Sequence, residues 1–248
     1  MKLADTRAVI TGGASGLGAA TARHFRDNGA SVTLFDRDAE KGQALAAEIG
    51  ATFVQVDVTD ADSVRDGLAA ARAAMGGINV AINCAGIATA ERTLGRKGPH
   101  DLETYRRTID VNLVGSFNVS RLAAAEMATN EGTEKGVIVM TASIAAFDGQ
   151  KGQAAYAASK AGIAGMCLPM ARDLASTGIR VNAIAPGIFA TPMLLELPEE
   201  VQAGLAADVT FPKRLGDPSE YAALAAFIVE CGYLNAETIR LDGALRMQ

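Results

Sequence analysis

Short apolar runs alternate with longer amphipathic segments along most of the chain. The runs are short enough for buried strands and are rich in Val and Ile. They are Arg7–Thr11, Ser31–Asp36, Phe53–Val58, Ile78–Ile82, Val137–Thr141, Ile179–Ala185 and Glu237–Leu241. Helical patterns lie between these runs. One begins at Gly18 and one surrounds Tyr156, and the others span 60–75, 102–127 and 217–229. This alternation predicts an α/β fold with a parallel sheet. Pro169 lies inside one helical pattern and should kink that helix or remove one backbone bond.

A glycine-rich turn joins the first strand to the first helix. Gly12, Gly16 and Gly18 allow a tight turn and a close backbone approach, and the helix that follows offers free N–H groups to a pyrophosphate. Asp36 ends the second strand, where an acid can bind ribose hydroxyls and repel a 2′-phosphate, which favours NAD over NADP. The alternative is that Asp36 is a turn or cap residue. Arg37 would soften the rejection of NADP.

Later strand ends add candidate contacts for the same ligand. Asp57 either accepts a bond from an adenine amino group or caps the helix that begins near Asp60. The small residues of Asn83–Gly86 let a cofactor pass close to the backbone. The turn at Pro186 and Gly187 leads to Thr191, which could bind a nicotinamide carboxamide, although such a turn needs no ligand to explain it.

Tyr156 and Lys160 form the candidate catalytic pair. Residues four apart on a helix leave the same face, about 5.4 Å apart along the axis. We expect the Lys160 ammonium to lower the pKa of the Tyr156 phenol, so that it exchanges protons with a substrate oxygen. Ser143, at a strand end, would hold that oxygen. Taken alone, a Tyr-x-x-x-Lys pattern is also common as an ordinary surface pair.

Three further segments lie outside this core pattern. Asn112, inside an apolar helix, is either a structural bridge or part of a polar chain that leads to Lys160. The polar loop 91–100 is either a solvated insertion or, through Arg92, Arg96 and Lys97, a site for the phosphates of an acyl-CoA. Residues 190–212 are apolar with acidic patches and form either a substrate lid or a plain pair of surface helices.

Composition narrows the functional classes. The 248 residues, 49% of them hydrophobic, suffice for a full core, and no linker divides them, so a single domain over 1–248 is expected. A net charge of -5 argues against nucleic-acid and membrane partners. The three cysteines lack metal or redox spacing, and with only His24 and His100 we expect no metal site. No signal, transit or membrane-spanning pattern is visible, which predicts a cytoplasmic protein.

The ordered set of motifs resembles the short-chain dehydrogenase/reductase family along the whole chain. It comprises Thr11–Gly18, Asp36, Asn83–Gly86, Asn112, Ser143, Tyr156, Lys160 and Pro186–Gly187. Within that family, a second set of segments is similar to the type II 3-hydroxyacyl-CoA dehydrogenases, also known as type 10 17β-hydroxysteroid dehydrogenases. The second set adds Gly152–Tyr156, Leu168–Pro169, Arg214–Pro218 and Ile239–Gln248.

The resemblance implies a doubly wound Rossmann domain with a seven-stranded parallel sheet and helices on both faces, NAD as cofactor, and a homotetramer. It implies Asn112, Ser143, Tyr156 and Lys160 as catalytic residues, and Ser143, Gln153 and Tyr156 as the substrate contacts. The expected cofactor contacts are Gly12, Ser15, Gly16, Leu17, Gly18, Asp36, Asp57, Val58, Cys84, Ala85, Gly86, Tyr156, Lys160, Pro186, Gly187, Phe189 and Thr191.

The expected reaction moves a hydride between a 3-hydroxyacyl-CoA and NAD, while Tyr156 acts as general acid/base. The same scaffold also serves 3-oxoacyl carrier-protein reductases and hydroxysteroid dehydrogenases, because fold does not fix substrate. A different class is a catalytically idle dinucleotide-binding assembly subunit. The complete set of four catalytic residues argues against that class.

Overall fold

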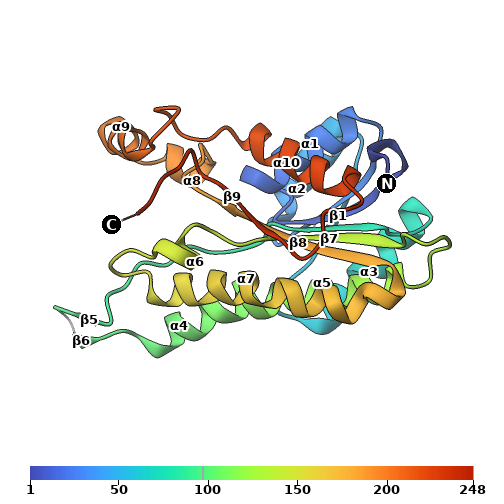
Figure 1. Cartoon of the computed structure of the whole chain (residues 1–248), viewed down its shortest axis with the longest axis horizontal. Coiled ribbons are helices and arrows are strands. Elements are labelled where there is room, and N and C mark those ends of the chain that lie inside the picture. Colours follow the sequence, from blue (N-terminus) through green and yellow to red (C-terminus); the bar gives the residue numbers. More distant parts are fainter. Residues whose placement is uncertain (97, 248) are drawn as a thin grey trace.

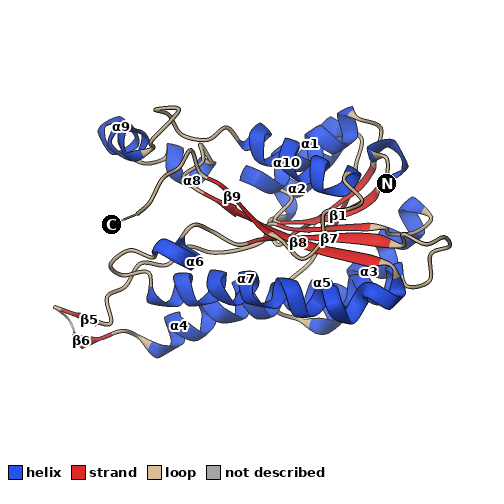
Figure 2. Ribbon diagram, viewed as in Figure 1, coloured by secondary structure: helices blue, strands red, loops and turns tan. Residues whose placement is uncertain are grey.

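The seven apolar runs predicted as strands form one parallel sheet in the computed structural model, which describes residues 1–96 and 98–247 (Figures 1 and 2). This confirms the predicted fold class. Across the sheet the strands are β3 (Thr52–Gln55), β2 (Ser31–Asp36), β1 (Arg7–Thr11), β4 (Val80–Asn83), β7 (Gly136–Thr141), β8 (Ile179–Pro186) and β9 (Thr238–Leu241). Every neighbouring pair is parallel.

Helices cover both faces of the sheet, as Figure 1 shows. One face carries α1 (Gly16–Asp27), α2 (Ala39–Ile49) and α10 (Pro218–Glu230). The other carries α3 (Ala61–Met75), α4 (Leu102–Ile109), α5 (Gly115–Met127), α6 (Ala145–Asp148) and α7 (Ala154–Leu174). Because successive strand residues point to opposite faces, Ile138 and Met140 enter one core while Val137 and Val139 enter the other. Two apolar cores therefore hold the three layers together.

The strand order places a crevice beside β1 and β4. From β1 the chain first builds the sheet outward through β2 and β3, and then returns to β4 and builds in the other direction. At such a reversal the loops after neighbouring strands part, and ligands bind outside the carboxyl ends of the strands. Gly12 follows β1 and Cys84 follows β4, so both lie at this switch point.

Several boundaries differ from the sequence predictions. Strand β3 ends at Gln55, which leaves Asp57 and Val58 in the following loop, and helix α2 was not anticipated. The long helix expected from Leu102 to Met127 contains a π-helical turn at Asp110–Val114. Pro169 lies inside α7, as the helical pattern predicted, and the helix continues to Leu174. A propensity pattern cannot reveal a π turn, because the same residues also suit an α-helix.

The remaining elements are short. Strands β5 (Leu94–Gly95) and β6 (Gly98–Pro99) form an antiparallel hairpin within the polar loop, away from the main sheet (Figure 1). Helices α8 (Pro192–Leu195) and α9 (Glu199–Asp208) occupy the segment 190–212, and 3-10 turns lie at Leu3–Asp5 and Ala175–Thr177. None of the helices in the described ranges combines the length and apolar character needed to cross a membrane.

Candidate active site

Two adjoining cavities lie at the carboxyl ends of the strands. The first, here called the glycine-turn cavity, has a volume of about 380 Å³ and is bordered by the turn after β1 and the ends of β2 and β4. The second, called the tyrosine cavity, has a volume of about 370 Å³ and contains Ser143, Tyr156 and Lys160 on its wall. Five residues border both: Leu17, Cys84, Gly86, Ile87 and Thr191. A ligand can therefore extend from one cavity into the other.

The glycine turn presents the start of α1 to the first cavity. Gly12 and Gly16 have φ of +62° and +52°, and a Cβ at Gly12 would stand 2.8 Å from the Ala85 nitrogen. Within the described residues, the Ser15 side chain makes no capping hydrogen bond at the start of α1, whereas Asp60 caps α3 with bonds to two backbone N–H groups. The first N–H groups of α1 thus remain free for an anion.

Asp36 lies where the sequence placed it, on the wall of the glycine-turn cavity. Its carboxylate accepts hydrogen bonds from the Ala14 backbone N–H at 3.0 Å and the Asp38 N–H at 3.0 Å. The cap of α2 is Asp38, so Asp36 is not a helix cap, whereas its bond from the Asp38 N–H makes it a turn residue, as the other part of that alternative expected. The bond from the Ala14 N–H also anchors Asp36 to the glycine turn, with its oxygens held beside the cavity.

Asp57 and Val58 also line this cavity, but Asp57 does not cap α3. The Asp57 carboxylate accepts bonds from the backbone N–H and the hydroxyl of Thr59, and it lies 3.6 Å from the Arg37 guanidinium. Burial raises the pKa of Asp57, and the Thr59 and Arg37 contacts outweigh that effect and lower it overall. Asp57 therefore stays ionised and keeps the Arg37 charge close to it.

The tyrosine cavity brings together residues that are far apart in the sequence. Ser143 follows β7, Gln153 and Tyr156 come from the start of α7, and Lys160 lies one turn further along that helix. Pro186, Gly187 and Phe189 follow from the end of β8, and Met247 from the end of the described chain. The Gln153 side chain accepts a bond from the Gln150 backbone N–H at 3.0 Å, which holds it at the rim.

Lys160 is buried, with a relative exposure of 5%, and its Nζ donates a 2.7 Å hydrogen bond to the Thr141 carbonyl. The Nζ lies 5.7 Å from the centroid of the Tyr156 ring. Burial lowers the pKa of Lys160 to about 8. Thr141 was not anticipated as part of the site. Its position at the end of β7, two residues before Ser143, could have indicated that it belongs to the site.

The expected lowering of the Tyr156 pKa is wrong for the protein without ligand. Burial raises the pKa of the Tyr156 phenol, and the interaction with the Ser143 side chain lowers it only in part. The physical reason is that the Lys160 ammonium is bonded to Thr141 and faces the ring, and desolvation penalises the phenolate. Tyr156 is thus neutral at pH 7.

Asn112 lies in the π turn and is buried completely. Its amide nitrogen donates to the Ile87 carbonyl and the Ser159 hydroxyl at 2.9 and 3.1 Å, and its oxygen accepts from the Ile87 backbone N–H at 2.8 Å. A Cβ at Gly86 would stand 3.2 Å from that oxygen. Asn112 therefore bridges the loop after β4 and helix α7, beside the residues common to both cavities.

The other predicted contacts are distributed between the two cavities. Gly12, Ser15, Gly16, Gly18 and Ala85 border the first, and Thr191 borders both. Of the basic trio, Lys97 lies outside the described residues, and Arg92 and Arg96 are not among the described residues that line either cavity. Leu194 and Leu205 on the tyrosine cavity lie in the segment 190–212 that the sequence offered as a lid, although neither residue was singled out, and sequence reasoning missed Met247, since a single apolar residue on a tail gives no signal. In the described ranges, no three acidic, His or Cys side chains are placed to hold a metal.

Comparison with known proteins agrees with this geometry. The family model "short chain dehydrogenase" matches residues 6–202. The chain is 56% identical to 3-hydroxyacyl-CoA dehydrogenase type-2 of Homo sapiens, over 97% of this chain and 95% of that protein. It is 52% identical to the protein of the same name in Drosophila melanogaster, over 96% of each. A crystal structure of 3-hydroxyacyl-CoA dehydrogenase type-2 from Mycobacterium avium superposes with a TM-score of 0.94 at 47% identity, covering 97% of this chain and 96% of that one.

Proposed function

The chain belongs to the short-chain dehydrogenase family, and we propose that it transfers a hydride between NAD and the hydroxyl-bearing carbon of a 3-hydroxyacyl-CoA. It is an oxidoreductase that acts on a secondary alcohol with a nicotinamide dinucleotide and a small-molecule substrate. One observation carries the proposal: Ser143, Tyr156 and Lys160 converge on a cavity that adjoins the glycine-turn cavity. The names of the relatives support the substrate class.

The glycine-turn cavity fits a dinucleotide. The free N–H groups at the start of α1 suit a pyrophosphate, and the turn passes so close to the next loop that a Cβ at Gly12 would stand 2.8 Å from the Ala85 nitrogen. Asp36 supports NAD over NADP, because its carboxylate would repel a 2′-phosphate. The pairing of Arg37 with Asp57 reduces the positive charge that Arg37 could offer to such a phosphate. When bound, the nicotinamide accepts or donates the hydride.

Within the tyrosine cavity, Ser143 would hold the substrate oxygen and Tyr156 would exchange the proton with it. In the reducing direction the neutral phenol of Tyr156 donates its proton to the oxygen. In the oxidising direction the Tyr156 phenolate must receive the hydroxyl proton. Because burial raises the pKa of Tyr156, we expect the oxidation rate to rise with pH above neutrality. Below about pH 8, the Lys160 ammonium supplies a positive charge beside the Tyr156 ring, held in place by its hydrogen bond to the Thr141 carbonyl.

The central test replaces Tyr156 with Phe, which removes only the hydroxyl. We expect oxidation of 3-hydroxybutyryl-CoA, followed through the absorbance of NADH, to fall by at least ~100-fold, while NADH binding measured by fluorescence is unchanged. Tyr233→Phe is the matched control, because Tyr233 is fully exposed and away from both cavities. Turnover of the Tyr156→Phe protein close to that of the unmodified protein would refute the proposed role.

A substrate comparison separates the proposal from its rivals. We expect 3-hydroxyacyl-CoA with NAD to give the highest kcat/KM among CoA thioesters, carrier-protein thioesters and steroid alcohols tested with both cofactors. A preference for a carrier-protein thioester with NADPH would instead favour a biosynthetic reductase.

We also propose that residues 190–212 act as a substrate lid. Helices α8 and α9 contribute Leu194 and Leu205 to the tyrosine cavity, so this segment bounds the substrate space. Leu195, Leu197 and Val201 are exposed on these helices and the link between them, which supports a segment that is not packed into the main core. Protection of 190–212 from proteolysis by NAD together with acetoacetyl-CoA would test the lid.

A homotetramer is the proposed assembly. Val114, Phe117 and Leu168 are each more than 40% exposed, and all three lie on the helical layer formed by α4, α5 and α7. Exposed apolar side chains in such a layer are typical of a subunit interface. Light scattering after size-exclusion chromatography should give four times the mass of the 25.5 kDa chain.

A further inference from the structure

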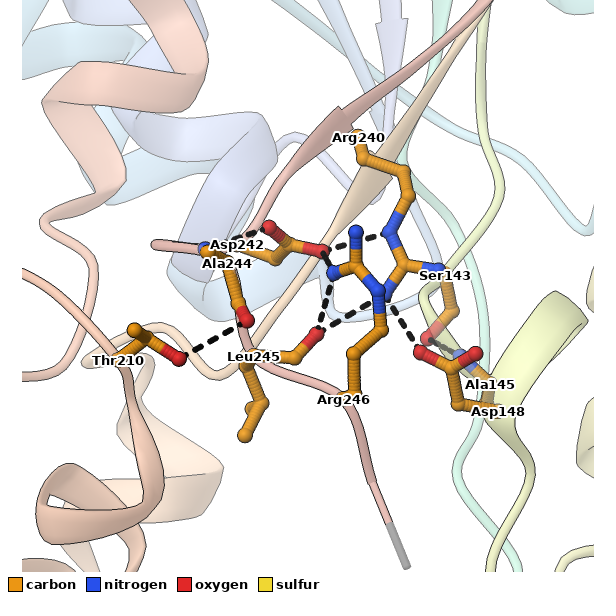
Figure 3. A network of polar contacts seen from close by, with 9 residues as sticks. All are labelled: Ser143, Ala145, Asp148, Thr210, Arg240, Asp242, Ala244, Leu245 and Arg246. Atoms are coloured by element: carbon orange, nitrogen blue, oxygen red, sulfur yellow. Dashed lines mark hydrogen bonds and ion pairs between the residues drawn. The ribbon is translucent and has the colours of Figure 1, made fainter.

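Arg240, on β9, forms a polar network beside the tyrosine cavity (Figure 3). Its Nε donates to the Asp242 carboxylate at 2.7 Å, and one terminal nitrogen donates to the Asp148 carboxylate at 2.6 Å and to the Leu245 carbonyl at 3.0 Å. The guanidinium carbon also lies 5.4 Å from the centroid of the Phe147 ring. The side chain of Arg240 is only 22% exposed, so these contacts are largely shielded from water.

On one side this network reaches the residue proposed to hold the substrate oxygen. Asp148 ends α6, a single helical turn that starts directly after the loop containing Ser143, and the Ser143 hydroxyl accepts a 3.1 Å bond from the Ala145 backbone N–H. One isolated turn has little stability of its own. Anchorage of Asp148 therefore fixes α6, and with it the direction of the Ser143 side chain. The hydrogen bond from Arg240 also lowers the pKa of Asp148, which keeps this carboxylate ionised.

On the other side the network reaches the C-terminal segment, defined here as residues 242–247. Asp242 receives bonds from Arg240 and from the Ala244 backbone N–H, and its own side chain is only 7% exposed. Thr210 and Phe211, at the end of the proposed lid, donate to the Ala244 and Gly243 carbonyls at 3.0 and 3.1 Å. The same segment then carries Met247 to the wall of the tyrosine cavity.

We infer that Arg240 is a positioning residue: by binding Asp148 and the C-terminal segment at once, it holds Ser143 and Met247 in place on the tyrosine cavity. Arg240 itself does not line that cavity among the residues that the structure describes, so it acts through the residues that it binds. The expected effect of Arg240 on catalysis rests on the proposed function. Its expected effect on the two segments rests on its hydrogen bonds alone. A planar fork is needed, because the nitrogens must reach two carboxylates and a carbonyl in different directions.

The kinetic test compares Arg240→Met, Asp148→Asn and the double variant with the unmodified protein. We expect kcat for 3-hydroxybutyryl-CoA to fall about tenfold or more in each single variant, because small displacements of positioned groups cost this much. NADH affinity should stay within about twofold, since no contact of Arg240 reaches the glycine-turn cavity in the described ranges. The double variant should be no worse than Arg240→Met alone, because the contact that Asp148→Asn disturbs is already lost in Arg240→Met.

Two further variants separate positioning from general destabilisation. Arg240→Lys keeps the positive charge but loses the planar guanidinium, so it should restore less than half of the kcat that Arg240→Met loses. The same variant replaces Arg240→Met in the kinetic test if Arg240→Met does not fold. Arg23→Met is the matched control, because Arg23 forms a forked pair with Glu48 on the surface of α1 and α2. Turnover of the Arg23→Met protein should equal that of the unmodified protein.

A readout that needs no substrate completes the test. Hydrogen exchange of the backbone at 143–148 and 243–247 should become faster in Arg240→Met and Asp148→Asn, and stay unchanged in Arg23→Met. Unchanged exchange in both segments, additive losses of kcat, or an equal loss of NADH affinity would each overturn the inference. Should the unmodified protein oxidise no 3-hydroxyacyl-CoA, the proposed function fails, and the exchange data still decide whether Arg240 holds the two segments.

Discussion

The two adjoining cavities are built in different ways. Most of the residues that line the glycine-turn cavity lie between Gly12 and Ile87, at or after the ends of β1 to β4. The tyrosine cavity is lined by residues from segments as far apart in the sequence as Leu17 and Met247. The first depends on local conformation, and the second on long-range packing. Substitutions in the two cavities should therefore have effects of different kinds.

Ser143→Ala should give the largest effect and confine it to the tyrosine cavity. Loss of the hydroxyl removes the contact proposed with the substrate oxygen and frees the Ala145 N–H, so we expect kcat to fall roughly 100-fold or more. NADH affinity should not change. Ser176→Ala, on an exposed turn, is the control. A comparable loss of NADH affinity in Ser143→Ala would show that the two cavities cannot be separated.

Gly12→Ala should damage the glycine-turn cavity through the backbone. An alanine at φ +62° is strained, and its Cβ would overlap the Ala85 nitrogen at 2.8 Å, so we expect a loss of roughly 2–4 kcal/mol in the free energy of unfolding. Gly132→Ala has a similar φ of +87° with open space around it and should lose about 1 kcal/mol. Urea denaturation of both variants measures the difference. Equal losses would mean that the close contact with Ala85 is unimportant.

Asp36→Asn should change cofactor choice more than stability. The amide still accepts the bond from the Ala14 N–H but no longer repels a 2′-phosphate, so we expect the NAD/NADP ratio of kcat/KM to fall about 10-fold or more. Adding Asp57→Asn should release Arg37 from its ion pair and lower the ratio further. A ratio that stays constant in both variants would remove Asp36 from the explanation of specificity.

The pH dependence of stability should reveal the burial of Lys160. Its pKa is about 8 in the folded protein, against 10.5 for a lysine in water, so above pH 8 the unfolded chain binds more protons and stability rises with pH. Between pH 8 and 9, without cofactor, the free energy of unfolding of the unmodified protein should rise by about 1 kcal/mol relative to that of Lys160→Met, as measured by urea denaturation. Parallel curves for the two proteins would show that Lys160 keeps its ordinary pKa.

The sequence predicted the glycine-turn cavity more fully than the tyrosine cavity. Gly12, Asp36 and the ends of the first strands belong to one short βαβ pattern, so spacing alone located them. The i, i+4 spacing likewise put Tyr156 and Lys160 on one helix face. The direction of the Tyr156 pKa was wrong, because spacing says nothing of desolvation or of the Thr141 carbonyl that binds Lys160. Met247 and Arg240 depend on tertiary contacts, for which the chain has no local pattern.

The π turn at Asp110–Val114 sets the rotational phase of everything that follows it in α5. Each residue of an α-helix turns the chain by about 100°, so removing one residue from this turn would restore regular winding and swing either Asn112 or the buried face of α5 away from its partner. Asn112 must meet Ile87, while Val119 and Ala123 must meet the core. The π turn allows one continuous helix to direct Asn112 toward Ile87 and the later residues toward the core.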